Sequence, residues 1–232
     1  MFPHVMRETA RMPDGRVHFS LFETPMVGCM VPGHEALNAA LVPRFLEMER
    51  DPVRYGDPRS WSNKFGALFE SRWDLFEQPH PAIAMLREHC LALVYETAAI
   101  VNEEFWATAG VELAGLKTLV ESWFHVTRNG GWHGLHKHAN NSWSGVYFVR
   151  RGSAAPAYPK NGFLRLHDPR PNISMFHDMA MIPFSAGVID IEPQDGKLIV
   201  FPSWLAHEVL PYFGDEPRIT VAFNVSIHLG AR

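Results

Sequence analysis

The chain has 232 residues, of which 47% are hydrophobic and 20% charged, and its formal net charge at pH 7 is −4. A chain of this length can bury a core of its own, so we expect residues 1–232 to form a single domain. No run of Lys and Arg is longer than Arg150-Arg151. These features exclude a strongly basic chain and predict neither a nucleic-acid partner nor an anionic membrane partner.

The cysteine content and the apolar pattern indicate a compartment. Cys29 and Cys90 are the only cysteines, too few for a disulfide framework, which favours a reducing environment. We find neither an apolar signal segment near the start nor a stretch of about 18 apolar residues later. We therefore expect a cytoplasmic protein that acts on a small or localised substrate. The sequence leaves the oligomeric state open, a homodimer included.

The first part of the chain is predicted to be mainly helical. Residues 18–31 have the composition of an early strand that is interrupted at Pro25 and Gly28. Residues 34–50 have apolar residues at helical spacing, and Pro43 is expected to bend this helix or to restart it.

A long connection and a second helix follow. Residues 51–80 are rich in Pro, Asp, Gly and Trp, so we expect an irregular segment that is functional or packs over the core. Pro81 suits the first turn of a helix that runs to about Trp106, and Gly110 is a suitable stop. The apolar face of this helix should pack against a sheet.

After residue 116 the pattern changes to short runs rich in β-branched and aromatic residues, bounded by Gly, Pro, Asn or Asp. We expect strands at residues 118–127, 144–149, 162–167, 187–191, 197–201 and 219–227. Helices followed by strands predict a mainly β fold of the α+β class. The expected form is an antiparallel sandwich or double-stranded barrel with helices packed on one side.

Three histidines stand close together before the second predicted strand. His133, His136 and His138 lie within six positions, and imidazole is the commonest protein ligand of borderline transition metals. In an extended segment residues two apart point the same way, so His136 and His138 can meet one ion. The alternative is a surface pair of histidines that binds nothing.

A second polar group lies far downstream and strengthens the metal hypothesis. His207 follows the strand expected at 197–201, and Arg218 opens the last expected strand. The planar guanidinium of Arg218 could bind a carboxylate through two hydrogen bonds, and Thr220, on the same face, could add a hydroxyl. The alternative for Arg218 is a surface ion pair with Asp215 or Glu216.

Several spaced segments, taken together, resemble a known family. They are His136-Lys137-His138 with WSGVYFV at 143–149, Asp168-Pro169-Arg170, FPSWLAH at 201–207 and RITVAFN at 218–224. In this order they are similar to the 2-oxoglutarate- and Fe(II)-dependent oxygenases of the prolyl-hydroxylase-like class, specifically a small bacterial and phage group. The resemblance covers roughly residues 18–229.

The resemblance implies a fold, a metal and a cosubstrate. It implies a double-stranded β-helix (jelly roll) over residues 117–232, with a mainly helical part over 1–116. It also implies Fe(II) held by His136 and His207 at the open end of the jelly roll, with His138 as the third ligand. The far carboxylate of 2-oxoglutarate would bind Arg218 and Thr220.

The third ligand departs from the wider superfamily, which has a carboxylate where this chain has His138. A three-histidine site keeps more positive charge on the metal and has a different redox poise. His138 also fills the position that would have to be vacant for a halide, which disfavours halogenation. The alternatives are that His138 contacts substrate, or that Asp168 supplies the carboxylate, although Asp168 is expected to pair with Arg170.

Further residues are candidate contacts of the cosubstrate or the substrate. Four residues could contact 2-oxoglutarate or the substrate, namely Tyr147, Trp143, Asn141 and Asn224, although aromatic residues in strands more often pack in the core. We expect His133 to lie at the lip of the pocket or to have a structural role. Substrate selection is expected from four places, which are Trp61, Trp73, the loop at 151–161 and the segment at 169–186.

The resulting prediction is an enzyme that decarboxylates 2-oxoglutarate to succinate. With dioxygen it would hydroxylate, or otherwise oxidise, a C–H bond of a small-molecule or peptide-borne substrate. One alternative is a three-histidine iron dioxygenase that needs no 2-oxoglutarate. The other is a jelly-roll binding protein without catalytic activity. The presence of both Arg218 and Thr220 in the sequence argues against these two alternatives.

Overall fold

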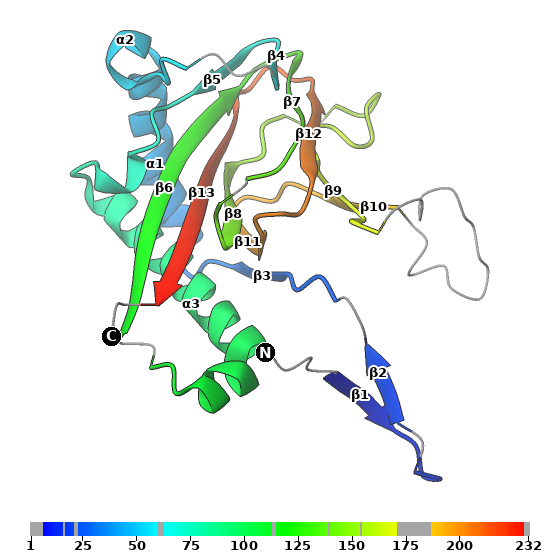
Figure 1. The fold of residues 1–232 in the computed structure, drawn as a ribbon. Helices are drawn as coiled ribbons and strands as arrows, with labels where there is room; N and C mark the ends of the chain where they lie inside the picture. The colour runs from blue at the N-terminus through cyan, green and yellow to red at the C-terminus, as the bar shows by residue number, and fades with distance from the viewer. Residues whose placement is uncertain are drawn as a thin grey trace.

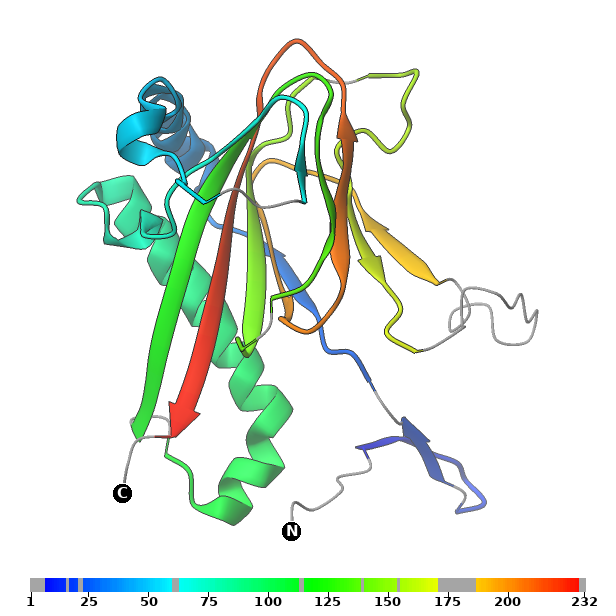
Figure 2. The ribbon, with the colours of Figure 1, turned by 45° about the horizontal axis from the view of Figure 1, so that its top comes forward.

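The computed structural model describes residues 7–15, 17–20, 23–59, 63–112, 115–138, 140–153, 155–170 and 187–229. Two antiparallel sheets of six and five strands face each other, and helices cover the outer side of the six-stranded sheet (Figures 1 and 2). This arrangement confirms the predicted mainly β fold with a helical layer on one side.

Three short strands precede the first helix. Strands β1 (Arg7–Arg11) and β2 (Val17–Ser20) form a separate two-stranded sheet, and β3 (Val27–Met30) pairs with β11 at one edge of the six-stranded sheet. The prediction of one interrupted strand over 18–31 was therefore wrong. The segment is divided between two sheets, and Pro25, which has no backbone N–H, lies in the link between them.

Four helices are present among the described residues, and the two long ones begin and end close to the predicted positions. They are α1 (His34–Glu49), α2 (Pro52–Tyr55), the 3₁₀ helix η1 (Leu75–Glu77) and α3 (Pro81–Ala109). Helix α1 continues through Pro43, because its apolar face is buried along its whole length from Leu37 to Met48. Helix α3 ends at Gly110, which adopts a φ of 63° and caps the helix in the left-handed conformation.

The connection at 51–80 is more ordered than we predicted. Besides α2 and η1 it contains β4 (Lys64–Phe65) and β5 (Leu68–Glu70). Strand β5 pairs with β6 and β4 pairs with β7, so this connection extends both sheets at one edge. Each of these strands is too short to produce a periodic pattern, which is why the sequence indicated a loop.

The six-stranded sheet has the order β3-β11-β8-β13-β6-β5. Its long strands are β6 (Leu116–Thr127), β8 (Trp143–Arg150), β11 (Lys197–Pro202) and β13 (Arg218–Leu229). Strand β13 lies between β6 and β8 and pairs with β6 over its full length, from Arg218 opposite Thr127 to Leu229 opposite Leu116. All four were predicted within a few residues.

The five-stranded sheet has the order β10-β9-β12-β7-β4. It contains β7 (Gly131–His136), β9 (Leu164–His167), β10 (Val188–Ile191) and β12 (His207–Tyr212). Strands β9 and β10 were predicted, whereas β7 and β12 were not. These two strands carry the histidines, so their pairing brings together two segments that are far apart in the sequence.

Side chains of the six-stranded sheet alternate between two environments. On β13, Ile219, Val221, Phe223 and Val225 pack in the core beneath α1 and α3, where α3 contributes residues such as Ile83 and Leu86. A smaller core, which includes Phe148, Phe201 and Leu164, lies between the two sheets. The residues of β13 between the core positions therefore point into the space between the sheets.

A glycine allows one of these core contacts. Gly145 on β8 lies opposite Phe223 on β13, and a Cβ added at Gly145 would come within 2.1 Å of the Phe223 ring. We predict that Gly145→Ala lowers the free energy of unfolding by roughly 1–3 kcal/mol, as overpacking of a core does. Urea denaturation measures this, and Gly115→Ala, whose Cβ would meet nothing within 4 Å, should leave stability nearly unchanged. Equal effects of both substitutions would contradict the packing argument.

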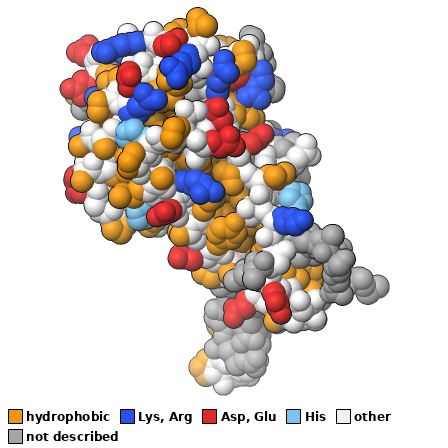
Figure 3. Space-filling model, turned by 90° about the vertical axis from the view of Figure 1, so that its left-hand side faces the viewer, with side chains coloured by type: hydrophobic (Ala, Val, Ile, Leu, Met, Phe, Trp, Pro, Cys, Tyr) orange, Lys and Arg blue, Asp and Glu red, His pale blue; other side chains and the backbone are white. Residues whose placement is uncertain are grey.

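The outer helical face presents charged side chains of both signs among apolar ones (Figure 3). Within the described ranges, every helix is too short or too polar to cross a lipid bilayer.

Candidate active site

Three imidazoles converge between the sheets. His136 ends β7, His207 begins β12, and the two residues are register partners on these adjacent strands. His138 lies two residues beyond His136, and its backbone N–H donates to the Ser203 carbonyl at 3.0 Å. One ligand atom from each of the three histidines lies within 4.8 Å of those of the other two. The structure thus places together the three residues that were predicted as metal ligands.

Two of these imidazoles are fixed in orientation by the backbone. His136 Nδ1 lies 2.7 Å from the Gly134 carbonyl oxygen, and His207 Nδ1 lies 2.8 Å from that of Leu205. Because a carbonyl oxygen only accepts, each Nδ1 carries the proton and each Nε2 keeps its lone pair. A metal-binding histidine is usually held in this way.

Burial keeps all three histidines neutral. The pKa of His138 is lowered to about 4, first by burial and then by the neighbouring His136. Burial, and after it the neighbouring His136, holds the pKa of His207 well below its usual value. Burial also lowers the pKa of His136. Neutral imidazoles with free lone pairs suit the binding of a transition metal, because no proton has to be displaced.

The histidines line a cavity of about 730 Å³ between the sheets. Its wall on the six-stranded sheet includes the side chains of β13 that point inward, which are Arg218, Thr220, Ala222, Asn224 and Ser226. Of the predicted substrate-selecting residues, Trp73 lines this cavity. The cavity is therefore continuous from the histidines to the predicted cosubstrate site.

Arg218 is the buried cation of the cavity. Only 2% of its surface is exposed, and its Nε and Nη2 atoms have no hydrogen-bond partner among the described residues. Burial lowers the pKa of Arg218 to about 10, so the guanidinium is still charged at neutral pH. A buried charge without a partner costs free energy, which an anionic ligand would recover. The surface ion pair considered as an alternative is not what the structure shows.

Other predicted contacts fall on both sides of the sheet. Asn141 and Asn224 line the cavity. Tyr147 is fully buried on the helical side of β8, where its hydroxyl donates to Asn38 Oδ1 on α1 at 2.7 Å. Tyr147 therefore lies outside the cavity, because strand alternation turns it toward the helices. Trp143, two residues earlier on β8, is buried in the same core, and we leave both out of the proposed site.

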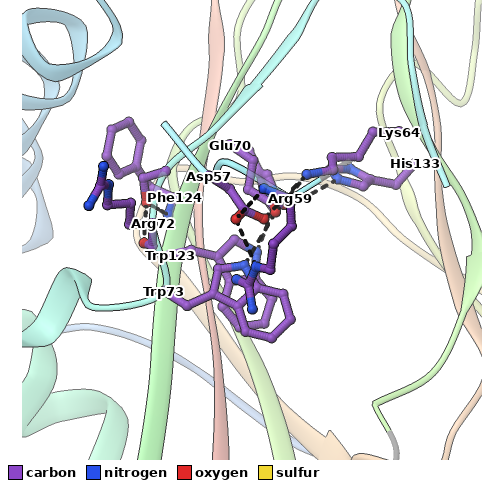
Figure 4. A network of polar contacts seen from close by, with 11 residues as sticks. Asp57, Arg59, Lys64, Glu70, Arg72, Trp73, Trp123, Phe124 and His133 are labelled. Atoms are coloured by element: carbon purple, nitrogen blue, oxygen red, sulfur yellow. Dashed lines mark hydrogen bonds and ion pairs between the residues drawn. The ribbon is translucent and has the colours of Figure 1, made fainter. Parts of the chain in front are cut away.

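A second polar cluster lies in the same cavity wall and was not predicted as a unit. It consists of Glu70 on β5, His125 on β6 and His133 on β7, with ligand atoms within 4.8 Å of one another. Glu70 Oε2 lies 2.8 Å from His125 Nε2 and 3.8 Å from His133 Nε2. On the other oxygen of Glu70, Lys64 donates at 2.9 Å and the Trp73 indole at 3.3 Å (Figure 4).

These contacts satisfy Glu70 without a metal. Burial raises the pKa of its carboxyl, but the hydrogen bonds to His125, His133 and Lys64 outweigh this effect and hold the pKa below its usual range. Because four donor groups already surround the two oxygens, we interpret the cluster as a charged support for this wall of the cavity. For His133 the structure therefore favours a structural role over a position at the lip of the pocket. No pattern in the sequence indicates this cluster, because its members come together only through strand pairing.

The buried histidines make stability sensitive to acid. The pKa of His133 is lowered to about 3, mainly by burial and then by His125, while an unfolded histidine titrates near 6.5. The unfolded chain thus binds more protons below pH 6.5, and stability falls as the pH falls. Between pH 6.5 and 4.5 we predict that the free energy of unfolding falls by about 2 kcal/mol less in His133→Gln than in the wild type. Urea denaturation at both pH values measures this, and the exposed His228→Gln should leave the loss unchanged.

The remaining predicted residues lie elsewhere. Asp168 pairs with Arg170, with Nε to Oδ1 at 2.9 Å, as expected for a residue that is not a ligand. Among the described residues of the loop at 151–161, none lines the cavity, so the prediction that this loop selects the substrate has no support there. Trp61 and most of the segment at 169–186 lie outside the described residues.

Fold and site together define a class of protein. A jelly roll with three neutral imidazoles at its cavity and an unpaired buried guanidinium in the same cavity suits one divalent metal and one dicarboxylic cosubstrate. These are the features of a 2-oxoglutarate- and Fe(II)-dependent oxygenase, a class of enzyme whose cofactors are Fe(II) and 2-oxoglutarate.

Comparison with known families gives the particular group. Residues 121–224 match the family described as "Putative 2OG-Fe(II) oxygenase", which confirms the resemblance seen in the sequence. This segment includes β8, most of β6 and of β13, and all of the predicted ligands. No curated protein matches the chain.

Solved structures of similar fold have low sequence identity. A prolyl-4-hydroxylase from Pseudomonas putida is 18% identical, with a TM-score of 0.56 over 88% of this chain and 92% of that one. A prolyl hydroxylase from Trichoplax adhaerens, in complex with a hypoxia-inducible-factor peptide, is 13% identical, with a TM-score of 0.58 over 87% and 83%. The carbocyclase SnoK from nogalamycin biosynthesis is 10% identical, with a TM-score of 0.58 over 90% and 83%. These likenesses establish the fold.

Proposed function

We propose that this single oxygenase domain couples the oxidative decarboxylation of 2-oxoglutarate to the hydroxylation of a C–H bond in a small-molecule or peptide-borne substrate. In this proposal His136, His138 and His207 hold the iron. Arg218 and Thr220 bind the far carboxylate of 2-oxoglutarate. Succinate and CO₂ are the products of the cosubstrate.

The observation that carries the proposal is the buried, unpartnered guanidinium of Arg218 in the cavity that the three histidines line. A dianionic cosubstrate with one end on the metal can place its other end on Arg218. Thr220, only 3% exposed and on the same face of β13, offers a hydroxyl to the same carboxylate.

The residues of the chain bind, orient and exclude water. When bound, iron supplies the redox chemistry with dioxygen that no side chain can perform. The backbone carbonyls of Gly134 and Leu205 hold His136 and His207 with their Nε2 atoms toward the metal position. The apolar layer of Phe148 and Phe201 between the sheets shields this region from solvent on the inner side.

Two alternatives differ in what they require of Arg218. An iron dioxygenase that binds its substrate directly on the metal needs no buried guanidinium in its cavity. A binding protein without catalysis would take up metal without consuming 2-oxoglutarate. The unpaired Arg218 supports the cosubstrate-dependent reaction over both. The similar structures include an enzyme named a carbocyclase, so proteins of this fold also have other reaction outcomes. Hydroxylation is proposed here as the simplest outcome.

Anaerobic reconstitution with Fe(II) tests the function. We expect a weak visible charge-transfer band that appears only after 2-oxoglutarate is added. On admission of dioxygen, 2-oxoglutarate should be converted to succinate slowly even without a second substrate. Turnover of another substrate in the absence of 2-oxoglutarate would favour the direct dioxygenase. Iron binding with neither band nor succinate would favour the binding protein.

A further inference from the structure

The inward face of β13 extends past the histidines in the direction away from Arg218. Ala222 is the register partner of Trp123, whose ring lies 5.6 Å from the His138 ring. The histidines are thus level with the middle of the strand. Asn224 is the next inward residue beyond Ala222, about 20 Å along the strand from Arg218. Cosubstrate and Asn224 therefore lie on opposite sides of the metal position.

The side chain of Asn224 is fixed by two serines. The Ser144 hydroxyl donates to Asn224 Oδ1 at 2.7 Å and lies 2.8 Å from the Ser203 hydroxyl. Because Ser144 has one proton, the Ser203 hydroxyl supplies the proton of the second contact. In this arrangement Ser203 donates to Ser144 and Ser144 donates to Asn224, so both hydroxyl protons are used. If the Asn224 amide were flipped, the hydroxyl proton of Ser203 would be left unused. The Asn224 Nδ2 group is thereby turned away from the serines.

This amide nitrogen is buried without a partner. Asn224 is 1% exposed, it lines the cavity, and its Nδ2 has no hydrogen-bond partner among the described residues. A buried donor that is left unpaired destabilises the protein. Arg218 and Asn224 are thus two buried donor groups on one strand, and the cosubstrate accounts for only one of them.

The neighbours of Asn224 restrict what it can bind. Glu121 on β6 is its register partner, so both side chains are on the same face of the sheet and about 5 Å apart at Cβ. The Glu121 carboxylate is an acceptor that would repel an anionic ligand. Trp123 and Leu119, the inward neighbours of Glu121 on β6, add apolar surface on either side.

We infer that Asn224 and Glu121 form a substrate subsite for an uncharged amide group. The substrate carbonyl would accept from Asn224 Nδ2 and its N–H would donate to Glu121, with the adjoining apolar part against Trp123. This inference rests on the proposed function, because it assigns the opposite side of the metal to 2-oxoglutarate. A peptide and a small carboxamide share this chemistry, and the test below distinguishes them.

The subsite is tested on Zn(II)-loaded, ¹⁵N-labelled protein without 2-oxoglutarate. The side-chain NH₂ signals of Asn224 are assigned by their loss in Asn224→Leu. The probes are N-acetylalanine methylamide, propionamide, 1,2-propanediol and acetate. We expect both amides to shift these signals, and the diol and acetate at equal concentration to leave them in place. Tighter binding of the blocked alanine would indicate a peptide source, and tighter binding of propionamide a small molecule.

Variants separate the subsite from the cosubstrate site. Asn224→Leu should weaken amide binding about tenfold, the value of one hydrogen bond, and leave 2-oxoglutarate binding within twofold. Asn63→Leu, in the same cavity but on another segment, should leave both unchanged.

Equal binding of the diol, or no shift with either amide, would overturn the inference. So would a loss of 2-oxoglutarate affinity in Asn224→Leu, which would make Asn224 a cosubstrate contact. Failure of the wild type to bind 2-oxoglutarate would instead refute the proposed function.

Discussion

Replacement of Arg218 by methionine is expected to raise the Kd for 2-oxoglutarate by roughly 10- to 150-fold, the value of a hydrogen bond to a charged group. Methionine keeps much of the side-chain volume but removes every donor. Isothermal titration of Zn(II)-loaded protein under anaerobic conditions measures the change. The residual affinity would report the contribution of the metal end of the cosubstrate.

The same substitution should stabilise the protein in the absence of ligand. Wild-type Arg218 carries a buried charge whose Nε and Nη2 have no partner among the described residues, and methionine removes that cost. Arg165→Met is a matched control, because Arg165 pairs with Asp190 on the other sheet and is away from the cavity. A normal Kd in Arg218→Met, or an equal loss in Arg165→Met, would refute the assignment of the cosubstrate carboxylate.

His207→Ala is expected to lower metal affinity by more than about 100-fold. Loss of an outer-shell partner alone costs 10–100-fold, and loss of a ligand should cost more. The measurement is competition for Zn(II) against a chelating indicator, with no turnover required.

His167→Ala serves as the control for this substitution. His167 ends β9, beside β12, and contacts Glu208 at 3.0 Å, outside the three-histidine group. Its removal should leave metal affinity within about twofold. If His207→Ala retained full affinity, His136 and His138 would have to bind metal with some other group, and the proposed ligand set would be wrong.

The sequence predicted the elements that have strong local patterns. Helix α3 and strands β6, β8 and β13 have long, regular patterns of apolar residues. These residues lie in the core, as predicted. Strands β7 and β12 were missed because glycine, histidine and proline break their alternation, and they become strands only by pairing with each other and with β4 and β9. The three proposed ligands could nevertheless be predicted, since their spacing within known motifs is independent of how the strands pair.

The rest of the site depends on contacts through space. Glu70 meets His125 and His133 only because β5 and β7 lie near β6, and nothing near Glu70 in the sequence indicates this. Tyr147 was misjudged by a single step of strand alternation, which turns its hydroxyl toward Asn38. The donor at Asn224 depends on which amide atom faces Ser144, a choice that only the hydrogen-bond network determines.

The pairing of His136 with His207 has a consequence for how the protein is held together. A metal bound to both residues joins points 71 positions apart (207 − 136) on adjacent strands. Such a cross-link restricts the unfolded chain as a disulfide would, by on the order of 4 kcal/mol for a loop of this length. Iron would then act as a reversible staple between β7 and β12, and cellular iron supply would govern the lifetime of the protein as well as its activity.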